Sequence, residues 1–573
     1  MKFIKLIILL FFIFSYSCKP VLPSPEIKSP WDLAVSMCFL PSGVQWVTVE
    51  GGAPLLEGME TLDIQVTTDD DLARKYFNQG LLLSYSFNHA EAARSFQYAY
   101  QLDPGFAMAF WGYAYVLGPN YNDGMDDDHY ELAFNAVKQA MARRSNTTLK
   151  EQRLIEALNS RYTSQPVNDR YDLDMAYSKN MESVYQSFPD DPDIGTLYAE
   201  SLMDLQPWDL WDKSGKPIGN AELIVDILEK VIESHPLHPG AHHLYIHAVE
   251  GSSAPERGLV SAKLLGDGLV PLAGHLVHMA SHIYIQTGDY NEGTLVNLKA
   301  AKVDSMYIKE CEAQGVYPIA YFPHNYHFMA GTAILEGNSH WAIYAADKLY
   351  EHVEKDLMGE EGLEVLHLFH TIPWFVRVKF GKWEDILNRK TESLEYPFIQ
   401  GVQHFARGMA FLGKEDGHNA EMEWRKLVEY TQDPSLENAL IWGINSLKSV
   451  LQIGERVLYG EWMASKGNTK EALIALKEAN DIEENLLFNE PPDWFLSVRH
   501  NLGAVLLEAG ETQEAIEVFR KDLKIYPRNG WALHGLKHAY KNNGNSKALQ
   551  EVDQQIADVW TTADISLVTS RIK

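Results

Sequence analysis

The stretch from Leu72 to Pro104, LARKYFNQGLLLSYSFNHAEAARSFQYAYQLDP, decides the fold of this chain. It reads as two amphipathic helices joined by a tight turn. Phe96 would fill the layer between the two helices, and Pro104 would end the second one because proline cannot continue a helix. Small residues stand where paired helices approach most closely, at Gly80, Ala92 and Ala99. The stretch therefore predicts a helical hairpin.

The same pattern returns near the C-terminal end, at Leu502, Gly503, Gly510, Ala515, Phe519 and Pro527. Weaker copies are best seen at their turns, which are Gly288-Asp289-Tyr290, Gly337-Asn338, Gly381-Lys382-Trp383 and Gly467-Asn468. In their spacing these copies resemble the tetratricopeptide repeat (TPR), over roughly residues 66–560. The resemblance implies an all-α solenoid of helical hairpins, a right-handed superhelix that forms one continuous repeat domain. Almost no stretch alternates with a period of two, so we expect no sheet.

The repeat region divides by its motifs into N-terminal and His-rich repeats over residues 66–340 and C-terminal repeats over residues 341–560, followed by a tail at 561–573. One irregular patch interrupts the array at residues 206–219, where tryptophans and prolines are close together. We expect this patch to form a long aromatic loop over one face of the solenoid.

Residues 1–17 have the pattern of a secretory signal. Two lysines precede an apolar run from Leu6 to Phe14, which is too short to span a bilayer. Small residues then precede Cys18, which resembles the lipobox of bacterial lipoproteins, where the cysteine is lipidated and becomes the first residue. This resemblance implies a lipid anchor at Cys18 in the cell envelope, and Lys19 after it favours the outer membrane. An ordinary signal peptide that happens to contain Cys18 is the alternative.

If the anchor is real, residues 18–65 form a tether and an N-terminal extension. The other two cysteines, Cys38 and Cys311, would then lie in an oxidising compartment. There they either pair or remain as two buried thiols.

Composition excludes several classes of function. The 49 Lys and Arg residues face 78 Asp and Glu residues, which gives a formal net charge of −29. Because contact with phosphate groups requires clustered Lys and Arg, we expect no nucleic-acid partner. Three cysteines are too few for a disulfide scaffold or a four-cysteine zinc site. The sequence also lacks a Walker A loop, a GxSxG elbow and an HExxH motif.

Histidine is concentrated in one part of the chain, since ten of the 21 histidines lie between His235 and His327. Aligned by the turns of their repeats, seven of them share three positions of three successive first helices: His275 and His324, then His243, His278 and His327, then His247 and His282. Glu250 follows on the first of these helices. In TPR proteins these positions line the concave groove that holds the ligand, so the resemblance implies a groove lined by imidazoles.

Helical geometry supports the same grouping without the resemblance. Side chains four residues apart lie on one face of a helix, about 6 Å apart at Cβ, and packed helices lie about 8–10 Å apart. We therefore predict a transition-metal site of six or seven histidines, and the scarcity of carboxylates favours copper or zinc over a di-iron centre. Such a site would hold one ion or two ions with three histidines each. Glu250 is a candidate general base should a three-histidine zinc activate water.

Two other interpretations remain open. In the first, the histidines are half-buried structural residues. In the second, the chain is a non-catalytic lipoprotein of an outer-membrane system that captures a protein or a glycan, such as an accessory protein in polysaccharide degradation. The His-rich motifs, with the stretch Glu490-Pro491-Pro492-Asp493-Trp494, also resemble as a set a group of bacterial TPR proteins without an established activity. That resemblance supports the fold and not a reaction.

Overall fold

The computed structural model describes residues 53–59, 61–313, 315–391 and 395–573, and the fold within them is helical. The first half of the chain forms α2 (Asp71–Ser84), α3 (His89–Leu102), α4 (Ala107–Val116), α5 (His129–Arg143), α6 (Leu149–Asn159), α7 (Tyr171–Ser187), α8 (Pro192–Met203), α9 (Ala221–Ser234), α10 (Pro239–Glu250), α11 (Leu259–Asp267), α12 (Gly274–His278), α13 (Ala280–Thr287) and α14 (Tyr290–Cys311).

The second half continues in the same way, with α15 (Phe322–Leu335), α16 (Ser339–Glu351), α17 (Val365–Lys379), α18 (Trp383–Asn388), α19 (Pro397–Gly413), α20 (Gly417–Thr431), α21 (Leu447–Ser465), α22 (Thr469–Asn485), α23 (Val498–Glu508), α24 (Thr512–Ile525), α25 (Gly530–Asn542) and α26 (Ser546–Val559). A π-helical turn at Tyr317–Tyr321 leads into α15. The strands β1 (Leu440–Ile441) and β2 (Asn445–Ser446) form one short antiparallel hairpin.

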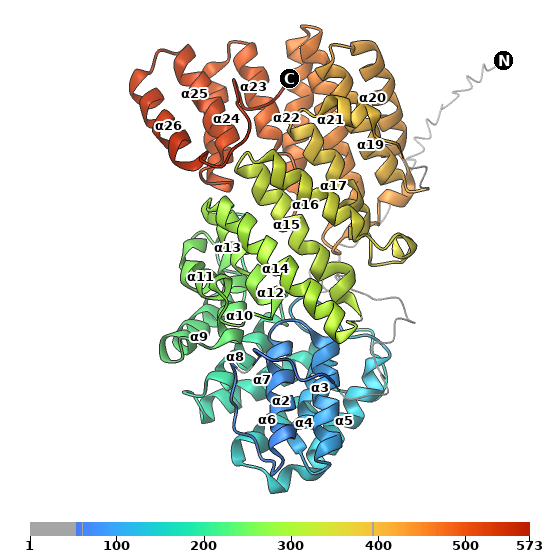
Figure 1. Cartoon of the computed structure of the whole chain (residues 1–573), viewed down its shortest axis with the longest axis vertical. Coiled ribbons are helices and arrows are strands. Elements are labelled where there is room, and N and C mark those ends of the chain that lie inside the picture. Colours follow the sequence, from blue (N-terminus) through green and yellow to red (C-terminus); the bar gives the residue numbers. More distant parts are fainter. Residues whose placement is uncertain (1–52, 60, 314, 392–394) are drawn as a thin grey trace, which may run out of the picture.

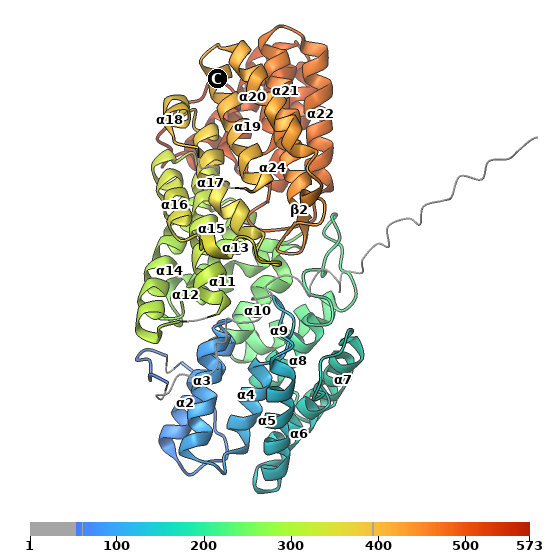
Figure 2. The same ribbon diagram turned by 90° about the vertical axis from the view of Figure 1, so that its right-hand side faces the viewer.

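Successive helices pack as antiparallel hairpins, which stack along the long axis of the molecule from α2–α7 at one end to α19–α26 at the other (Figures 1 and 2). The predicted all-α solenoid of TPR-type hairpins is therefore confirmed. The only sheet among the described residues is the two-stranded β1–β2 hairpin.

The residues that predicted the first hairpin act as expected. A Cβ atom on Gly80 would lie 2.9 Å from the Phe96 ring, and one on Gly112 would lie 2.3 Å from it, so Phe96 fits only between glycines. The last repeats use the same arrangement, because a Cβ atom on Gly503 or on Gly535 would lie 2.3 or 2.4 Å from the Phe519 ring. The spacing of glycine and phenylalanine in the sequence thus reports direct contacts between neighbouring helices.

The turns predicted from glycine also lie where the sequence places them. Each glycine adopts a positive φ between two helices, a conformation that residues with a Cβ atom rarely take: Gly288 (82°), Gly337 (77°), Gly381 (61°) and Gly467 (76°). Apolar side chains between the hairpins form two main core clusters, one from Ala53 to Tyr317 and one from Ala301 to Val552.

The two halves are connected by contacts between segments far apart in the sequence. The segment between α22 and α23 returns to α13, where the Glu490 carboxylate accepts from the Gln286 amide. The Trp531 indole donates to the backbone oxygen of Ile334 at 2.7 Å, and the Tyr290 hydroxyl donates to the backbone oxygen of Pro527 at 2.6 Å. These contacts close the C-terminal hairpins onto the middle of the solenoid.

The predicted signal segment, Cys18 and Cys38 lie outside the described residues. Cys311 is buried at the end of α14, where burial raises the pKa of its thiol to about 12. Within the described part of the chain, no helix combines the length and the apolar character that crossing a membrane requires.

Candidate metal centre

The predicted histidines lie on four helices in the middle of the molecule. α10 carries His243 and His247, α12 and α13 carry the next three, and α15 carries the last two. Six of the seven are 3 % exposed or less: His243, His247, His275, His278, His282 and His327. His324 is the seventh, and its exposure is intermediate.

The rings form a continuous set of contacts across these helices. Neighbouring ring centroids are 5.0 Å apart for His243 and His275, 5.4 Å for His247 and His282, and 5.1 Å for His278 and His324. We call the six residues that share these contacts the histidine cluster: His243, His247, His275, His278, His282 and His324. Six of the seven histidines that the alignment of repeat positions grouped therefore lie in one site.

The sequence predicted that these rings line an open groove, whereas the structure buries them. The Phe87 ring, from the turn between α2 and α3, lies 4.5 Å from the His243 ring and 5.3 Å from the His275 ring. On the other side, Glu490 from the C-terminal half contacts His282. The solenoid curves enough for remote segments to cover its inner face, which spacing within one repeat does not reveal.

One nitrogen of each of four cluster rings is held by a hydrogen-bond acceptor. The Nδ1 atom of His243 lies 2.6 Å from the backbone oxygen of Tyr85, and that of His278 lies 2.6 Å from Oδ1 of Asn297. The amide nitrogen of Asn297 donates to the backbone oxygen of Gly293, which fixes its Oδ1 toward His278. These Nδ1 atoms must carry the hydrogen, so the lone pair of each ring is on Nε2.

Glu250 holds two more rings. Its Oε1 accepts from Nδ1 of His247 at 2.8 Å, and its Oε2 accepts from Nδ1 of His282 at 2.6 Å. Burial alone would raise the pKa of the Glu250 carboxyl, but the two imidazoles lower it to about 2. Both oxygens of Glu250 are thus engaged in orienting rings, which favours an orienting role over the general base that the sequence suggested.

The opposite ring nitrogens have no partner outside the cluster. Four of these atoms are buried and make no hydrogen bond: Nε2 of His243, His247 and His275, and Nδ1 of His324. Nε2 of His278 lies 3.1 Å from Nε2 of His282. Since Nδ1 of both rings carries a hydrogen, only a shared proton or a metal ion can sit between these two lone pairs. The four unpartnered nitrogens would remain unsatisfied even with that proton.

Three overlapping groups have ligand atoms within 4.8 Å of one another: His243, His247 and His275; His278, His282 and His324; and His247, Glu250 and His282. His327 belongs to none of them, although both its ring nitrogens are buried without a hydrogen bond. Its ring instead stacks on the Phe495 ring at a centroid distance of 5.2 Å. His89, in the turn of the first hairpin, packs beside Phe87.

Burial sets the charge of the cluster. It lowers the pKa of His243, His275, His278 and His324 well below the usual value, and it also lowers that of His247. His282 differs because burial lowers its pKa, while Glu250 and Glu490 together raise it to about 9. Most of the rings are therefore neutral at pH 7, the form that binds a metal ion.

A further carboxylate positions two of the ring-bearing helices. Asp304 of α14 accepts from the Tyr317 hydroxyl at 2.7 Å and from the Asn325 amide at 2.6 Å, and Asn325 is next to His324. A Cβ atom on Gly274, which precedes His275, would lie 1.9 Å from Oδ1 of Asp304. Asp304 thus fixes the starts of α12 and α15 relative to each other.

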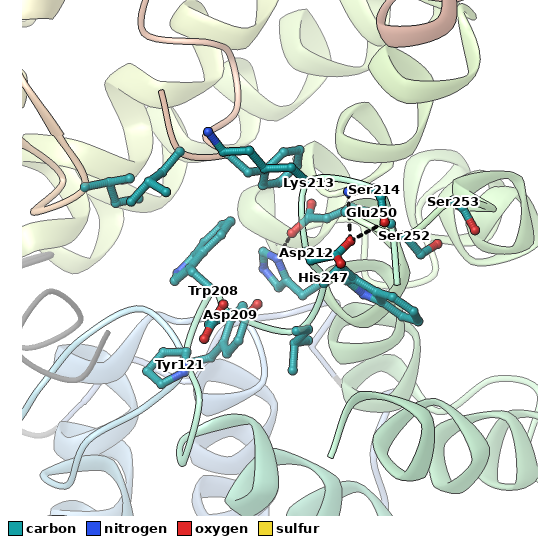
Figure 3. Close-up of a pocket in the computed structure, with 18 residues that line it drawn as sticks. Tyr121, Trp208, Asp209, Asp212, Lys213, Ser214, His247, Glu250, Ser252 and Ser253 are labelled. Carbon is teal, nitrogen blue, oxygen red and sulfur yellow. Dashed lines mark hydrogen bonds and ion pairs between the residues drawn. The ribbon is translucent and has the colours of Figure 1, made fainter. Parts of the chain in front are cut away.

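A cavity of about 560 Å³ reaches the cluster at His247 and Glu250 (Figure 3). It lies under the loop between α8 and α9, residues 204–220, which we call the aromatic loop. The sequence predicted this loop but not its position over the histidines. The cavity provides a route by which a small molecule can approach the buried cluster.

Comparison with known proteins adds little to this geometry. No family model matches the chain, and no curated protein matches it. Among solved structures it is similar to a human IFIT1 dimer with m7Gppp-AAAA, at 12 % identity over 87 % of this chain and 92 % of that one, with a TM-score of 0.31. It is also similar to the APC/C hetero-tetramer Cut9–Hcn1, at 12 % identity over 84 % and 76 %, with a TM-score of 0.30.

Proposed function

We propose that the histidine cluster binds one or two transition-metal ions, copper or zinc. The observation that carries this proposal is the difference between the two nitrogens of each held ring. Nδ1 atoms point outward to Glu250, Asn297 and a backbone oxygen. The buried Nε2 atoms of His243 and His247 have no partner, and those of His278 and His282 face only each other, at 3.1 Å. Metal-binding histidines in proteins are held by carboxylates and carbonyls in this way, which fixes the ring and raises its basicity.

The ligand set favours these two metals. Imidazole suits copper and zinc, and the cluster has six imidazoles but only two carboxylates nearby among the described residues, Glu250 and Glu490. The two three-histidine groups are the natural positions for two ions. Three protein ligands leave a coordination position open, as in catalytic rather than closed structural sites. A bound ion would supply Lewis-acid or redox chemistry, and we include catalysis in the proposal on this ground.

We also propose that a lipid anchor at Cys18 holds the protein in the outer membrane. The support is the basic and apolar pattern of residues 1–17 with small residues before Cys18. Cys18→Ala should move the protein from the membrane fraction to the soluble fraction of its host. Retention of that variant in the membrane would argue against the anchor.

Elemental analysis of the purified protein tests the metal site. We expect about one or two equivalents of copper or zinc, lost in a His243→Ala/His278→Ala variant that keeps its helical circular dichroism. His327→Ala is the matched control, because this buried histidine of α15 lies outside the three ligand groups and its loss should leave the metal in place. Absence of bound metal after reconstitution with copper, zinc, iron and manganese would refute the proposal.

A further inference from the structure

The cavity beside the metal centre is built from both halves of the chain. The aromatic loop and the turn after α10 line it, and Ile444, Leu487 and Phe488 of the C-terminal half complete the lining. His247 and Glu250 lie on its wall, beside Trp208 (Figure 3). At about 560 Å³ the cavity has the size of sites that hold small organic molecules.

Fixed aromatic rings line the cavity next to the cluster. Trp208 stacks on Tyr121 at a centroid distance of 5.3 Å, and the two rings lie 5.5 Å and 5.2 Å from the His247 ring. Trp208 adopts a φ of 59°, a conformation that is costly for a bulky side chain and that the surrounding structure must enforce. Trp211 is held by its indole, which donates to the backbone oxygen of Ala248 at 2.8 Å. These rings are in place before any ligand arrives.

Several polar groups on the cavity wall already have partners. Oδ1 of Asp212 accepts from the backbone nitrogen of Ser214 at 2.8 Å and from its hydroxyl at 2.7 Å. Nζ of Lys213 donates to the backbone oxygen of Glu484 at 3.0 Å, and Oγ of Ser252 accepts from the backbone nitrogen of Ala254 at 3.1 Å. In contrast, Nε1 of Trp208 is buried without a partner. A sugar, with a hydroxyl on nearly every carbon, would have to compete with these existing hydrogen bonds.

The charges on the wall select against anions. Asp209, Asp212 and Glu250 contribute three carboxylates to the lining, and Lys213 contributes the only Lys or Arg side chain among the described residues that line it. Before a metal ion is bound, a ligand with a carboxylate or phosphate group would meet this negative potential. An uncharged ligand with a flat apolar face suits both the charge and the aromatic walls.

From these observations we propose that the cavity is the substrate pocket of the metal centre and that it takes an uncharged aromatic compound with one polar substituent, of the phenol class. This inference rests on the proposed metal centre and not on the proposed lipid anchor. The flat face of the ligand packs against the Trp208 indole, and its polar substituent faces His247. Trp208 is then a specificity-determining residue.

Ligand-detected NMR and calorimetry with three probes test the chemical class. Methyl 4-hydroxybenzoate is the uncharged aromatic probe, 4-hydroxybenzoate is its anionic counterpart, and methyl β-glucopyranoside is the sugar. In the metal-free protein we expect the ester to bind and the other two to bind at least about tenfold more weakly. Trp208→Ala should weaken ester binding roughly tenfold. Phe488→Ala, at a partly exposed residue of the cavity rim, should also weaken it and is less prone to disturb folding.

Leu295→Ala is the matched control, because this exposed apolar residue of α14 is outside the cavity and its loss should leave ester binding unchanged. Cobalt(II) loaded into the protein tests the location. A bound ester beside the centre should show strong paramagnetic relaxation, which is absent in the zinc-loaded protein.

The outcomes separate this inference from the proposed function. No ester binding, or equal binding of the anion or the sugar, would overturn the pocket assignment while the metal content stays intact. Ester binding without paramagnetic relaxation, in a protein that holds stoichiometric cobalt, would also overturn it. If the protein takes up no metal at all, the proposed function fails, and the assignment of a substrate pocket to that centre falls with it even where the ester still binds in a Trp208-dependent way.

Discussion

Two buried polar regions of this protein contain histidine but use it in opposite ways. In the C-terminal half, His500 is 2 % exposed, as buried as five of the six rings of the histidine cluster. Its Nδ1 accepts from Nζ of Lys379 at 2.7 Å, and its Nε2 donates to Oδ2 of Asp522 at 3.0 Å. Asp522 also accepts from the Ser497 hydroxyl at 2.5 Å and from the Asn529 amide at 2.8 Å. We call these five residues the polar cluster.

The difference lies in the second ring nitrogen. Both nitrogens of His500 have protein partners, so the polar cluster is complete without a ligand. In the histidine cluster, by contrast, unpaired nitrogens of several rings converge on one another in a buried space. Burial and histidine content alone do not separate a structural site from a binding site, whereas converging unpaired lone pairs do.

The sharpest test of this contrast is His500→Ala. Removing the ring leaves the Lys379 ammonium and the Asp522 carboxylate buried without the group that joins them, so we expect a loss of about 3–5 kcal/mol in the free energy of unfolding. The metal content should stay at the wild-type value. Urea unfolding of the metal-free protein and elemental analysis measure the two effects, and a fall in metal content would remove the contrast.

Metal removal should destabilise the wild-type protein and leave the stability of the His243→Ala/His278→Ala variant unchanged. A metal present at about 100 times its dissociation constant contributes about 2.7 kcal/mol to the free energy of unfolding, because it binds the folded chain only. Thermal unfolding with and without a chelator measures this difference. His243→Ala/His278→Ala should show no chelator effect, and an equal effect in that variant would place the metal elsewhere.

Glu250→Gln sharpens the comparison inside the histidine cluster. The amide keeps the shape of the carboxylate but directs a donor at one of the two Nδ1–H groups, so one ring loses its support. We expect the metal affinity to fall about 10–100-fold, as for other carboxylates that orient metal-bound histidines. Competition with a chromophoric chelator gives the affinity. Glu336→Gln, a change at a buried glutamate whose partners are Thr294, Asn291 and Thr562, is the control and should leave the affinity unchanged.

The polar cluster should also make the free energy of unfolding depend on pH, an effect smaller than those above. Burial lowers the pKa of Lys379 from 10.5 to about 7. Above pH 7 the unfolded chain therefore binds one more proton than the folded chain, so the free energy of unfolding rises with pH toward 10.5. Below pH 7 both states are protonated and this slope disappears.

Lys379→Met should abolish that slope, which we expect to amount to roughly 2 kcal/mol between about pH 7 and pH 9. Urea unfolding of the two proteins across this range, in the metal-free state, measures it. Equal slopes in the variant and the wild type would show that Lys379 stays protonated in the folded protein.

Particular residues show how much of the packing and of the site the sequence predicted. Phe96 packs between Gly80 and Gly112 because helices joined in a hairpin bring small and large side chains into fixed register. The same periodicity placed six histidines on adjoining faces of α10, α12, α13 and α15. His327 was included with them by its repeat position, yet its ring turns toward Phe495, a residue more than 160 positions later in the chain.

The sequence by itself determined the solenoid and the gathering of imidazoles, because both follow from contacts between neighbouring helices. Only the tertiary structure decided which ring nitrogens are paired. The partner of His243 is the backbone oxygen of Tyr85, 158 residues away, and the second carboxylate on His282 belongs to Glu490. These contacts depend on the curvature summed over many repeats, which no local spacing encodes. The same curvature buries the cluster and builds the cavity beside it.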